Sequence, residues 1–139
     1  MPDYPRDLIG YANNPPDPKW PNKARLAVNF VINYEEGSEY SIPDGDGFSE
    51  ASLTESPSST IPNGTRDLAA ETLFEYGSRV GFWRLLRLFK ERDFPVTLFA
   101  CALALERNPK VVEAVKTSNL DICCHGWRWI EHYKLTEDE

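Results

Sequence analysis

The sequence has little positive charge and no long apolar run, and each shortage excludes a class of partner. Its 139 residues include 15 Lys and Arg against 22 Asp and Glu, which gives a formal net charge of −7. This balance opposes binding to a phosphate backbone or to an anionic membrane surface. The longest apolar run, residues 94–105, is interrupted by Pro95 and Thr97 and is shorter than the roughly 20 residues that span a bilayer. We therefore expect no nucleic acid and no membrane among its partners.

Cysteine is also scarce. The chain has three cysteines, an odd number, at positions Cys101, Cys123 and Cys124, and none of them belongs to a CxxC metal motif. The amino end has neither a basic start nor an apolar stretch, so it shows no secretory leader. These features predict a cytoplasmic location, with the three cysteines buried in reduced form.

Proline is concentrated at the amino end, where six of the eleven prolines lie within the first 22 residues. Each proline fixes its own backbone and removes an N–H donor, which favours an extended lead-in over a helix. We therefore divide the chain into a proline-rich arm (1–24) and a domain (25–139) that contains a polar loop at about 37–66.

Within the domain, apolar segments typical of strands alternate with segments of helical periodicity. The predicted segments, in order, are a strand at 25–33, a helix from the cap at 76–78 to the stop at 93–95, a strand at 95–101, a helix opening at 108–109 and a strand at 120–124. The near-continuous apolarity of the first strand predicts burial on both of its faces. The alternation of strands and helices indicates the α/β class with a parallel sheet.

Titratable residues follow two of the predicted strands. Glu35 and Glu36 come after the first strand, and His125 comes after the third. In parallel α/β folds the active site lies at the carboxyl ends of the strands. A carboxylate there is a candidate general base, and the imidazole is a candidate proton donor or oxyanion partner. The alternative is that the glutamates are solvated and the histidine is structural; the shared position at strand ends favours a site.

Two motifs at these strand ends resemble a known family. Residues 30–37 (FVINYEEG) and 121–130 (DICCHGWRWI) are similar to the first two motifs of the polysaccharide deacetylase (NodB homology) superfamily. Residues 4–11 and 76–84 are similar in detail to its metal-independent, PuuE-type allantoinase branch. The resemblance implies the amino-terminal part of an irregular (β/α) barrel. Because that family continues beyond its second motif, we expect a truncated catalytic domain that forms homo-oligomers when full length.

The sequence departs from the metal-dependent members of the superfamily. Those enzymes have an Asp pair where this chain has Glu35 and Glu36, the first acid acting as base and the second binding metal. They also have a second His four places after the first, where this chain has Trp129, while His132 stands at the wrong spacing. The loss of a ligand predicts a site without metal or other cofactor.

A separate pattern in the polar loop imitates a calcium site. Asp44-Gly45-Asp46 and Glu55 are spaced like the ends of a calcium-binding loop. Phe48 and Ser49 occupy places that require a ligand and a glycine, so we expect no calcium there.

The reaction implied by the resemblance is hydrolysis of a cyclic ureide, allantoin to allantoate, in purine catabolism. Glu35 or Glu36 would activate water, with the order left open, and His125 would act as acid or oxyanion partner. The remaining candidates are expected to bind substrate: Trp127 and Trp129 as aromatic walls, and Arg128 on an anionic or carbonyl group. Two alternatives are a metal-dependent carbohydrate N-deacetylase and an inactive remnant or assembly module.

Overall fold

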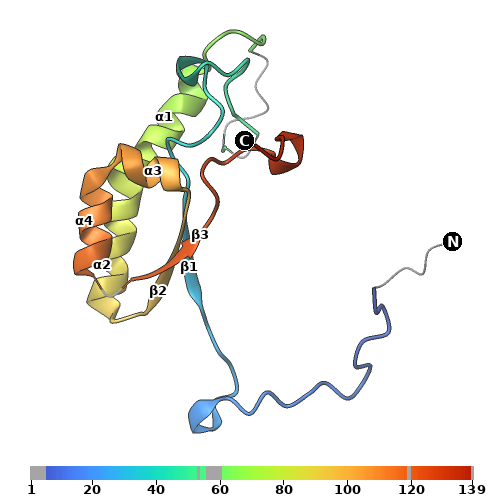
Figure 1. The fold of residues 1–139 in the computed structure, drawn as a ribbon. Helices are drawn as coiled ribbons and strands as arrows, with labels where there is room; N and C mark the ends of the chain where they lie inside the picture. The colour runs from blue at the N-terminus through green and yellow to red at the C-terminus, as the bar shows by residue number, and fades with distance from the viewer. Residues whose placement is uncertain (1–5, 53, 56–60, 119, 139) are drawn as a thin grey trace, which may run out of the picture.

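The computed structural model describes residues 6–52, 54–55, 61–118 and 120–138, so residues 4 and 5 of the amino-terminal motif lie outside it. Its centre is a three-stranded parallel sheet in the order β1-β2-β3. The strands are β1 (Phe30–Tyr34), β2 (Val96–Ala100) and β3 (Asp121–Cys124). Figure 1 shows the four α-helices on one side of this sheet. The α/β class with a parallel sheet is therefore confirmed.

The first strand is shorter than predicted. It begins at Phe30 and not at residue 25, and Leu26 and Val28 are exposed. The register explains the late start, because Phe30 lies opposite Val96 and the residue before Val96 is Pro95. Proline has no N–H to offer to a ladder, so pairing does not extend further toward the amino end.

The prediction that β1 is buried on both faces is wrong for the described part of the chain. Ile32 and Tyr34 are buried toward the helices, whereas Val31 on the other face is 49% exposed. Side chains alternate between the two faces of a strand, and among the described elements only one face is covered by helices. The core is therefore one-sided. Its members are Ile32, Tyr34, Phe82, Val96, Leu98, Ala100, Cys101, Ala104 and Val111.

A long helical segment connects the polar loop with β2. It consists of α1 (Leu68–Tyr76), a π-helical turn (Gly77–Gly81) and α2 (Phe82–Arg92). The predicted helix start at 76–78 is wrong: the helix begins after Asp67, whose carboxylate accepts hydrogen bonds from the backbone N–H groups of Ala69 and Ala70, both at 3.1 Å. The predicted end is confirmed, because Asp93 adopts the left-handed conformation that terminates α2.

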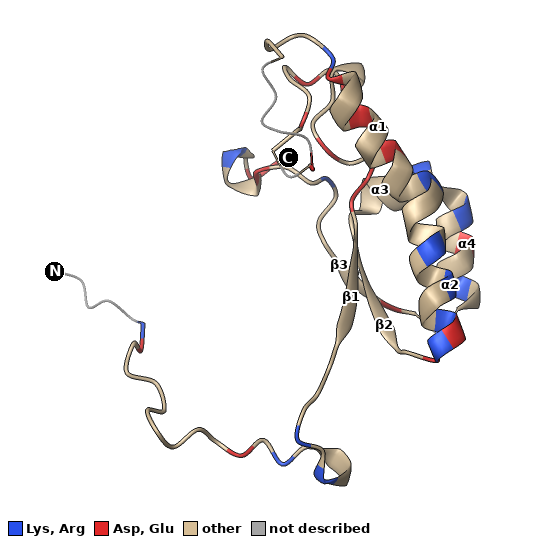
Figure 2. Cartoon of the chain, turned by 180° about the vertical axis from the view of Figure 1, so that it is seen from behind, with Lys and Arg blue, Asp and Glu red and all other residues tan. Residues whose placement is uncertain are grey.

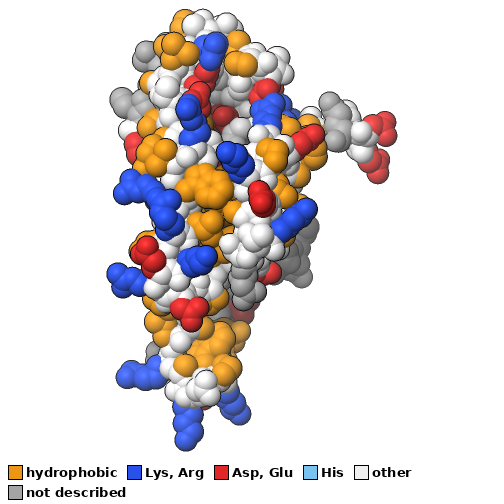
Figure 3. Space-filling model, turned by 90° about the vertical axis from the view of Figure 1, so that its left-hand side faces the viewer, with side chains coloured by type: hydrophobic (Ala, Val, Ile, Leu, Met, Phe, Trp, Pro, Cys, Tyr) orange, Lys and Arg blue, Asp and Glu red, His pale blue; other side chains and the backbone are white. Residues whose placement is uncertain are grey.

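The outer side of the helical layer is charged and partly apolar. Figure 2 shows Lys and Arg along α2 and α4, and Figure 3 shows apolar side chains between the charged ones. On α2, Trp83, Leu86 and Phe89 pack against the core, whereas Leu85 and Leu88 are 40% and 45% exposed.

Two helices connect β2 with β3. The short α3 (Ala102–Arg107) was not predicted, and α4 (Pro109–Thr117) confirms the helix predicted to open at 108–109. Cys101, at the start of α3, is buried as expected. Cys123 and Cys124 are exposed, which contradicts the expected burial; they lie on β3, an edge strand of the described sheet.

The amino-terminal segment lies away from the sheet. Residues 6–29 are exposed throughout, and Figure 1 shows them extending from the lower end of β1. Between β1 and α1 the chain forms one short 3-10 turn, Ile42–Asp44, among its described residues. No described helix combines the length and the apolarity that a bilayer span requires.

Candidate active site

The glutamates and the histidine meet at the carboxyl end of the sheet. Glu35 and Glu36 directly follow β1, and His125 directly follows β3. A carboxylate oxygen of Glu35 (Oε1) lies 2.5 Å from Nε2 of His125, and the side chains of Glu35 and His125 are 22% and 27% exposed. The structure therefore places a carboxylate–imidazole pair where parallel α/β folds carry their active sites.

The β2 strand and its extension orient His125. The backbone N–H of His125 donates to the carbonyl of Ala100 at 3.0 Å, and the thiol of Cys101 donates to the carbonyl of His125 at 3.3 Å. The imidazole stacks on the ring of Phe99, with 3.9 Å between centroids and 15° between planes. These contacts fix the backbone and the ring plane, so Nε2 points at Glu35.

Glu36 occupies a different environment from Glu35. Its Oε2 accepts a hydrogen bond from the backbone N–H of Glu35 at 3.2 Å. The carboxyl group lies so close to Gly77 that a Cβ atom there would collide with it. Burial raises the pKa of Glu36 above its usual value, and the nearby charges of Glu35 and Glu39 raise it further. Neutral Glu36 is therefore favoured over a range of pH in which an ordinary glutamate is ionised.

A cavity of about 480 Å³ opens beside the two glutamates. Of the two predicted aromatic walls, Trp129 lines it and contacts the edge of Phe74, with 6.3 Å between ring centroids. Trp127 is 58% exposed and is not among the described lining residues. The described lining residues are Glu35, Glu36, Thr54, Glu55, Leu73, Phe74, Tyr76, Gly77 and Trp129.

Arg128 lies elsewhere, with its guanidinium bound to protein groups. Its Nη2 and Nη1 donate to the two carboxylate oxygens of Asp46 at 2.7 and 3.2 Å, and Nη2 also donates to the carbonyl of Glu39 at 2.8 Å. The hydrogen bond from Arg128 lowers the pKa of Asp46. In this structure Arg128 is not among the described residues that line the cavity, and its fork faces the polar loop.

Three residues that shape this site were not predicted from the sequence: Ser38, Asp46 and Gly77. Asp46 was considered only as part of the calcium-like pattern, and no calcium-type ligand set forms around it among the described residues. Ser38 and Gly77 carry no titratable group, so a search of the sequence for titratable side chains does not select them. The only available signal was the position of Gly77 inside an otherwise helical segment.

The donor groups at the site do not fit the metal centre of metal-dependent superfamily members. Trp129 stands where those enzymes have a second His, and Nε2 of His125 is held by Glu35. Within the described ranges there is no group of three or more His, Cys, Asp or Glu side chains placed to hold an ion. His132 is exposed, and its Nε2 lies 3.3 Å from the carbonyl of Arg128.

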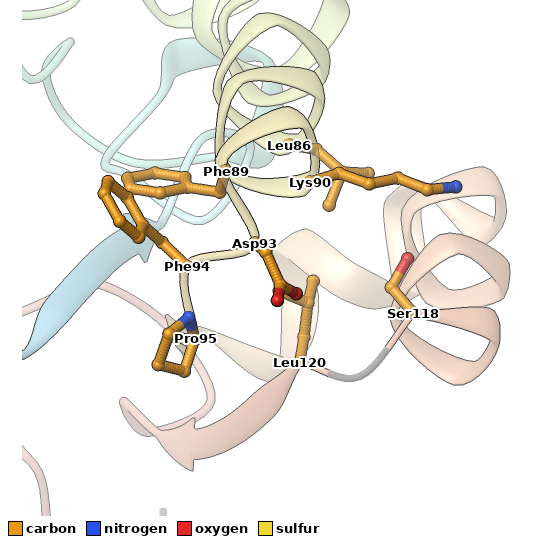
Figure 4. Close-up of a pocket in the computed structure, with 8 residues that line it drawn as sticks. All are labelled: Leu86, Phe89, Lys90, Asp93, Phe94, Pro95, Ser118 and Leu120. Carbon is orange, nitrogen blue, oxygen red and sulfur yellow. The ribbon is translucent and has the colours of Figure 1, made fainter.

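A second cavity, of about 340 Å³, lies at the opposite end of the sheet (Figure 4). Phe89 and Phe94 line it near the end of α2, and Leu120 lines it just before β3; Lys90 and Asp93 are its charged described lining residues. This is the amino end of the strands, which in parallel α/β folds contributes to stability more than to chemistry. We therefore place the candidate active site at the carboxyl end.

Known proteins resemble this chain over nearly its whole length. Residues 63–139 match the polysaccharide deacetylase family. A provisionally named polysaccharide deacetylase of Schizosaccharomyces pombe is 45% identical over 129 residues, which are 91% of this chain and 40% of that protein. The crystal structure of PuuE allantoinase is 52% identical with a TM-score of 0.88, over 98% of this chain and 45% of that chain.

A second crystal structure, of a provisionally named polysaccharide deacetylase from Pseudomonas aeruginosa PAO1, is also 52% identical. Its TM-score is 0.87, over 97% of this chain and 45% of that chain. The 139 residues thus span less than half the length of each of these relatives. Their parallel sheet and helices match part of the NodB-type barrel of the solved neighbours. The chain belongs to the polysaccharide deacetylase family.

Proposed function

We propose that this site hydrolyses a cyclic ureide of the allantoin type. The observation that carries the proposal is the 2.5 Å contact between Glu35 and His125 beside a cavity that Phe74 and Trp129 line. Indole and phenyl rings suit a small flat ring substrate, and a carboxylate–imidazole pair suits proton transfer to and from an amide. The 52% identity to a protein crystallised as an allantoinase supports the same choice.

The two glutamates take different roles in this proposal. Glu35 accepts a proton from water as the water oxygen bonds to a ring carbonyl carbon. His125 passes a proton to the ring nitrogen as the C–N bond breaks, so the products are a carboxylate and an open ureide. Glu36 lines the same cavity, and burial raises its pKa. A carboxyl group donates a hydrogen bond to an oxygen that gains charge only when it is protonated, so this contribution from Glu36 belongs to the pH range below its folded pKa.

A second candidate is N-deacetylation of a carbohydrate. The neighbour from Pseudomonas aeruginosa is as similar to this chain as the allantoinase is, and it carries a deacetylase name. The same carboxylate and imidazole would serve for water attack on an acetamide. The side chains around His125 favour ureide hydrolysis over deacetylation, because metal-dependent deacetylation requires a metal ligand at the position of Trp129.

The experiment compares the two substrates on the purified protein. We expect formation of allantoate from allantoin, no acetate from N-acetylated chito-oligosaccharides, and an unchanged rate in excess chelator. Glu35→Gln removes the base and should lower kcat by about 10²–10⁴-fold, whereas Glu75→Gln, on the exposed side of α1, should leave it unchanged. Acetate release that chelator abolishes would establish the deacetylase instead, and an unchanged rate in Glu35→Gln would refute the assigned base.

A further inference from the structure

Sheet hydrogen bonding alone does not set the distance between Glu35 and His125. The strands that precede them, β1 and β3, are separated by β2. Neighbouring strands lie about 4.8 Å apart, so the two strand ends are separated by roughly 10 Å. Two flexible side chains must reach across the end of β2 to meet at 2.5 Å. The segments that follow the strands therefore have to hold the two residues in place.

Arg128, three residues after His125, binds the segment that follows Glu35. Besides the two hydrogen bonds to Asp46 and the one to the carbonyl of Glu39, its Nε donates to the carbonyl of Ser38 at 3.4 Å. The side chains of Arg128 and Asp46 are 19% and 16% exposed. A planar guanidinium that fills four acceptors in this way specifies orientation as well as distance.

Ser38 connects Arg128 to Glu35. Ser38 is fully buried, and its backbone N–H and its hydroxyl both donate to the carbonyl of Glu35, at 2.9 and 2.5 Å. The carbonyl of Ser38 also accepts from the backbone N–H of Trp129 at 3.1 Å. A continuous path of hydrogen bonds thus runs from the residues after His125, through Ser38, to the backbone of Glu35.

We propose that Arg128 is a positioning residue that holds the Glu35 carboxylate against His125 through the Ser38 turn. The proposal rests on the proposed function for its kinetic consequence. It replaces the expectation that Arg128 binds substrate, since Nε, Nη1 and Nη2 of the guanidinium all donate hydrogen bonds to residues 38–46. Asp46 acts together with Arg128, because its carboxylate holds the guanidinium in the plane in which it reaches the carbonyls of Ser38 and Glu39.

A second arginine binds the same loop from α3, but it is more exposed. Arg107 pairs with Asp44 at 2.6 Å and donates to the carbonyl of Gly37. Its side chain is 42% exposed, more than twice the figure for Arg128. Exposed ion pairs contribute little because water and salt screen them. We therefore assign the positioning role to the Arg128–Asp46 pair.

The kinetic test uses Arg128→Lys and Asp46→Asn. Lysine keeps the charge but not the fork, so we expect kcat to fall about 10- to 100-fold, as small misplacements of catalytic groups do, with KM within about twofold of the wild type. In a Glu35→Gln background, Asp46→Asn should cause no further loss of kcat.

The matched control is Arg79→Lys, which alters the exposed Arg79–Glu75 pair and should change neither kcat nor KM. A raised KM with an unchanged kcat would make Arg128 a substrate ligand and overturn the proposal.

A second measurement does not depend on turnover. NMR resonances of the His125 ring, assigned by comparison with His125→Gln, should shift in Asp46→Asn in the same direction as in Glu35→Gln, and should stay unchanged in Arg79→Lys. Unshifted His125 resonances in Asp46→Asn would refute the positioning role. If these resonances shift as expected while the wild type opens no ureide ring, the proposed function fails and the positioning role stands.

Discussion

At the scale of single residues, burial separates two adjacent glutamates that the sequence does not distinguish. Glu35 reaches His125 across β2, while Glu36 turns toward the helix and lies against Gly77. The sequence predicted that both would lie near the histidine, since all three follow parallel strands. It could not order their roles, because that order depends on how closely the π-helical turn at Gly77 approaches the carboxyl group of Glu36. This is a tertiary contact between residues 41 positions apart in the chain.

The raised pKa of Glu36 predicts a pH dependence of stability. The folded chain binds this proton more tightly than the unfolded chain, whose glutamate titrates near 4.5. The favourable contribution is thus complete below about that pH and is lost as the pH rises through the folded pKa. Glu36→Gln mimics the protonated form, so it should stabilise the protein at pH 8 but not at pH 4, by about 1.4 kcal/mol for each unit of pKa shift.

Urea unfolding of the wild type and of Glu36→Gln at the two pH values measures this difference. Glu75→Gln serves as the control, because it removes only an exposed ion pair with Arg79, and its effect should differ between the two pH values by less than about 0.5 kcal/mol. An equal effect of Glu36→Gln at pH 4 and pH 8 would contradict the assignment of a desolvated carboxyl.

At the scale of elements, local signals predicted the existence of strands and helices better than their limits. The stop at Asp93 and the proline at the start of α4 are local features of backbone chemistry, and both predictions are confirmed. The start of β1 depends on its register against Pro95, and the start of α1 depends on which of several polar residues becomes the cap. Neither choice is encoded within a short window of sequence.

The cap of α1 supplies a prediction at this scale. Asp67 accepts from the N–H groups of Ala69 and Ala70, which otherwise have no partner within the helix. Asp67→Ala should therefore lower the free energy of unfolding by about 1–2 kcal/mol. Asp67→Asn, which keeps an acceptor oxygen, is the matched variant and should lose less than half as much in denaturant titrations. Equal losses in the two variants would show that the carboxylate acts through something other than capping.

At the scale of the whole molecule, the described core lies on only one face of the sheet. Leu98 and Val96 are buried under the helices, whereas Val31 and Ile122 are 49% and 51% exposed. The resemblance to a (β/α) barrel anticipated a parallel sheet, but the burial of each face could not be predicted from apolarity alone. An apolar strand residue is compatible with either face, and which face is covered depends on where the neighbouring elements pack.

This asymmetry predicts two unequal responses to mutation of the same sheet. Leu98→Ala deletes fully buried methyl groups and should destabilise the 139-residue chain by about 2–5 kcal/mol. Val31→Thr and Ile122→Thr alter side chains that are half in water, so each should change the free energy of unfolding by less than about 0.5 kcal/mol. Denaturant midpoints of the three variants test this, with the slope of the transition checked for constancy. A loss of about 2 kcal/mol or more in Val31→Thr, against roughly 0.5 for an exposed site, would show that the second face of the sheet is covered in solution. The concentration dependence of the midpoint would then distinguish self-association from a structure that buries Val31 within one chain, because only self-association makes the midpoint rise with protein concentration.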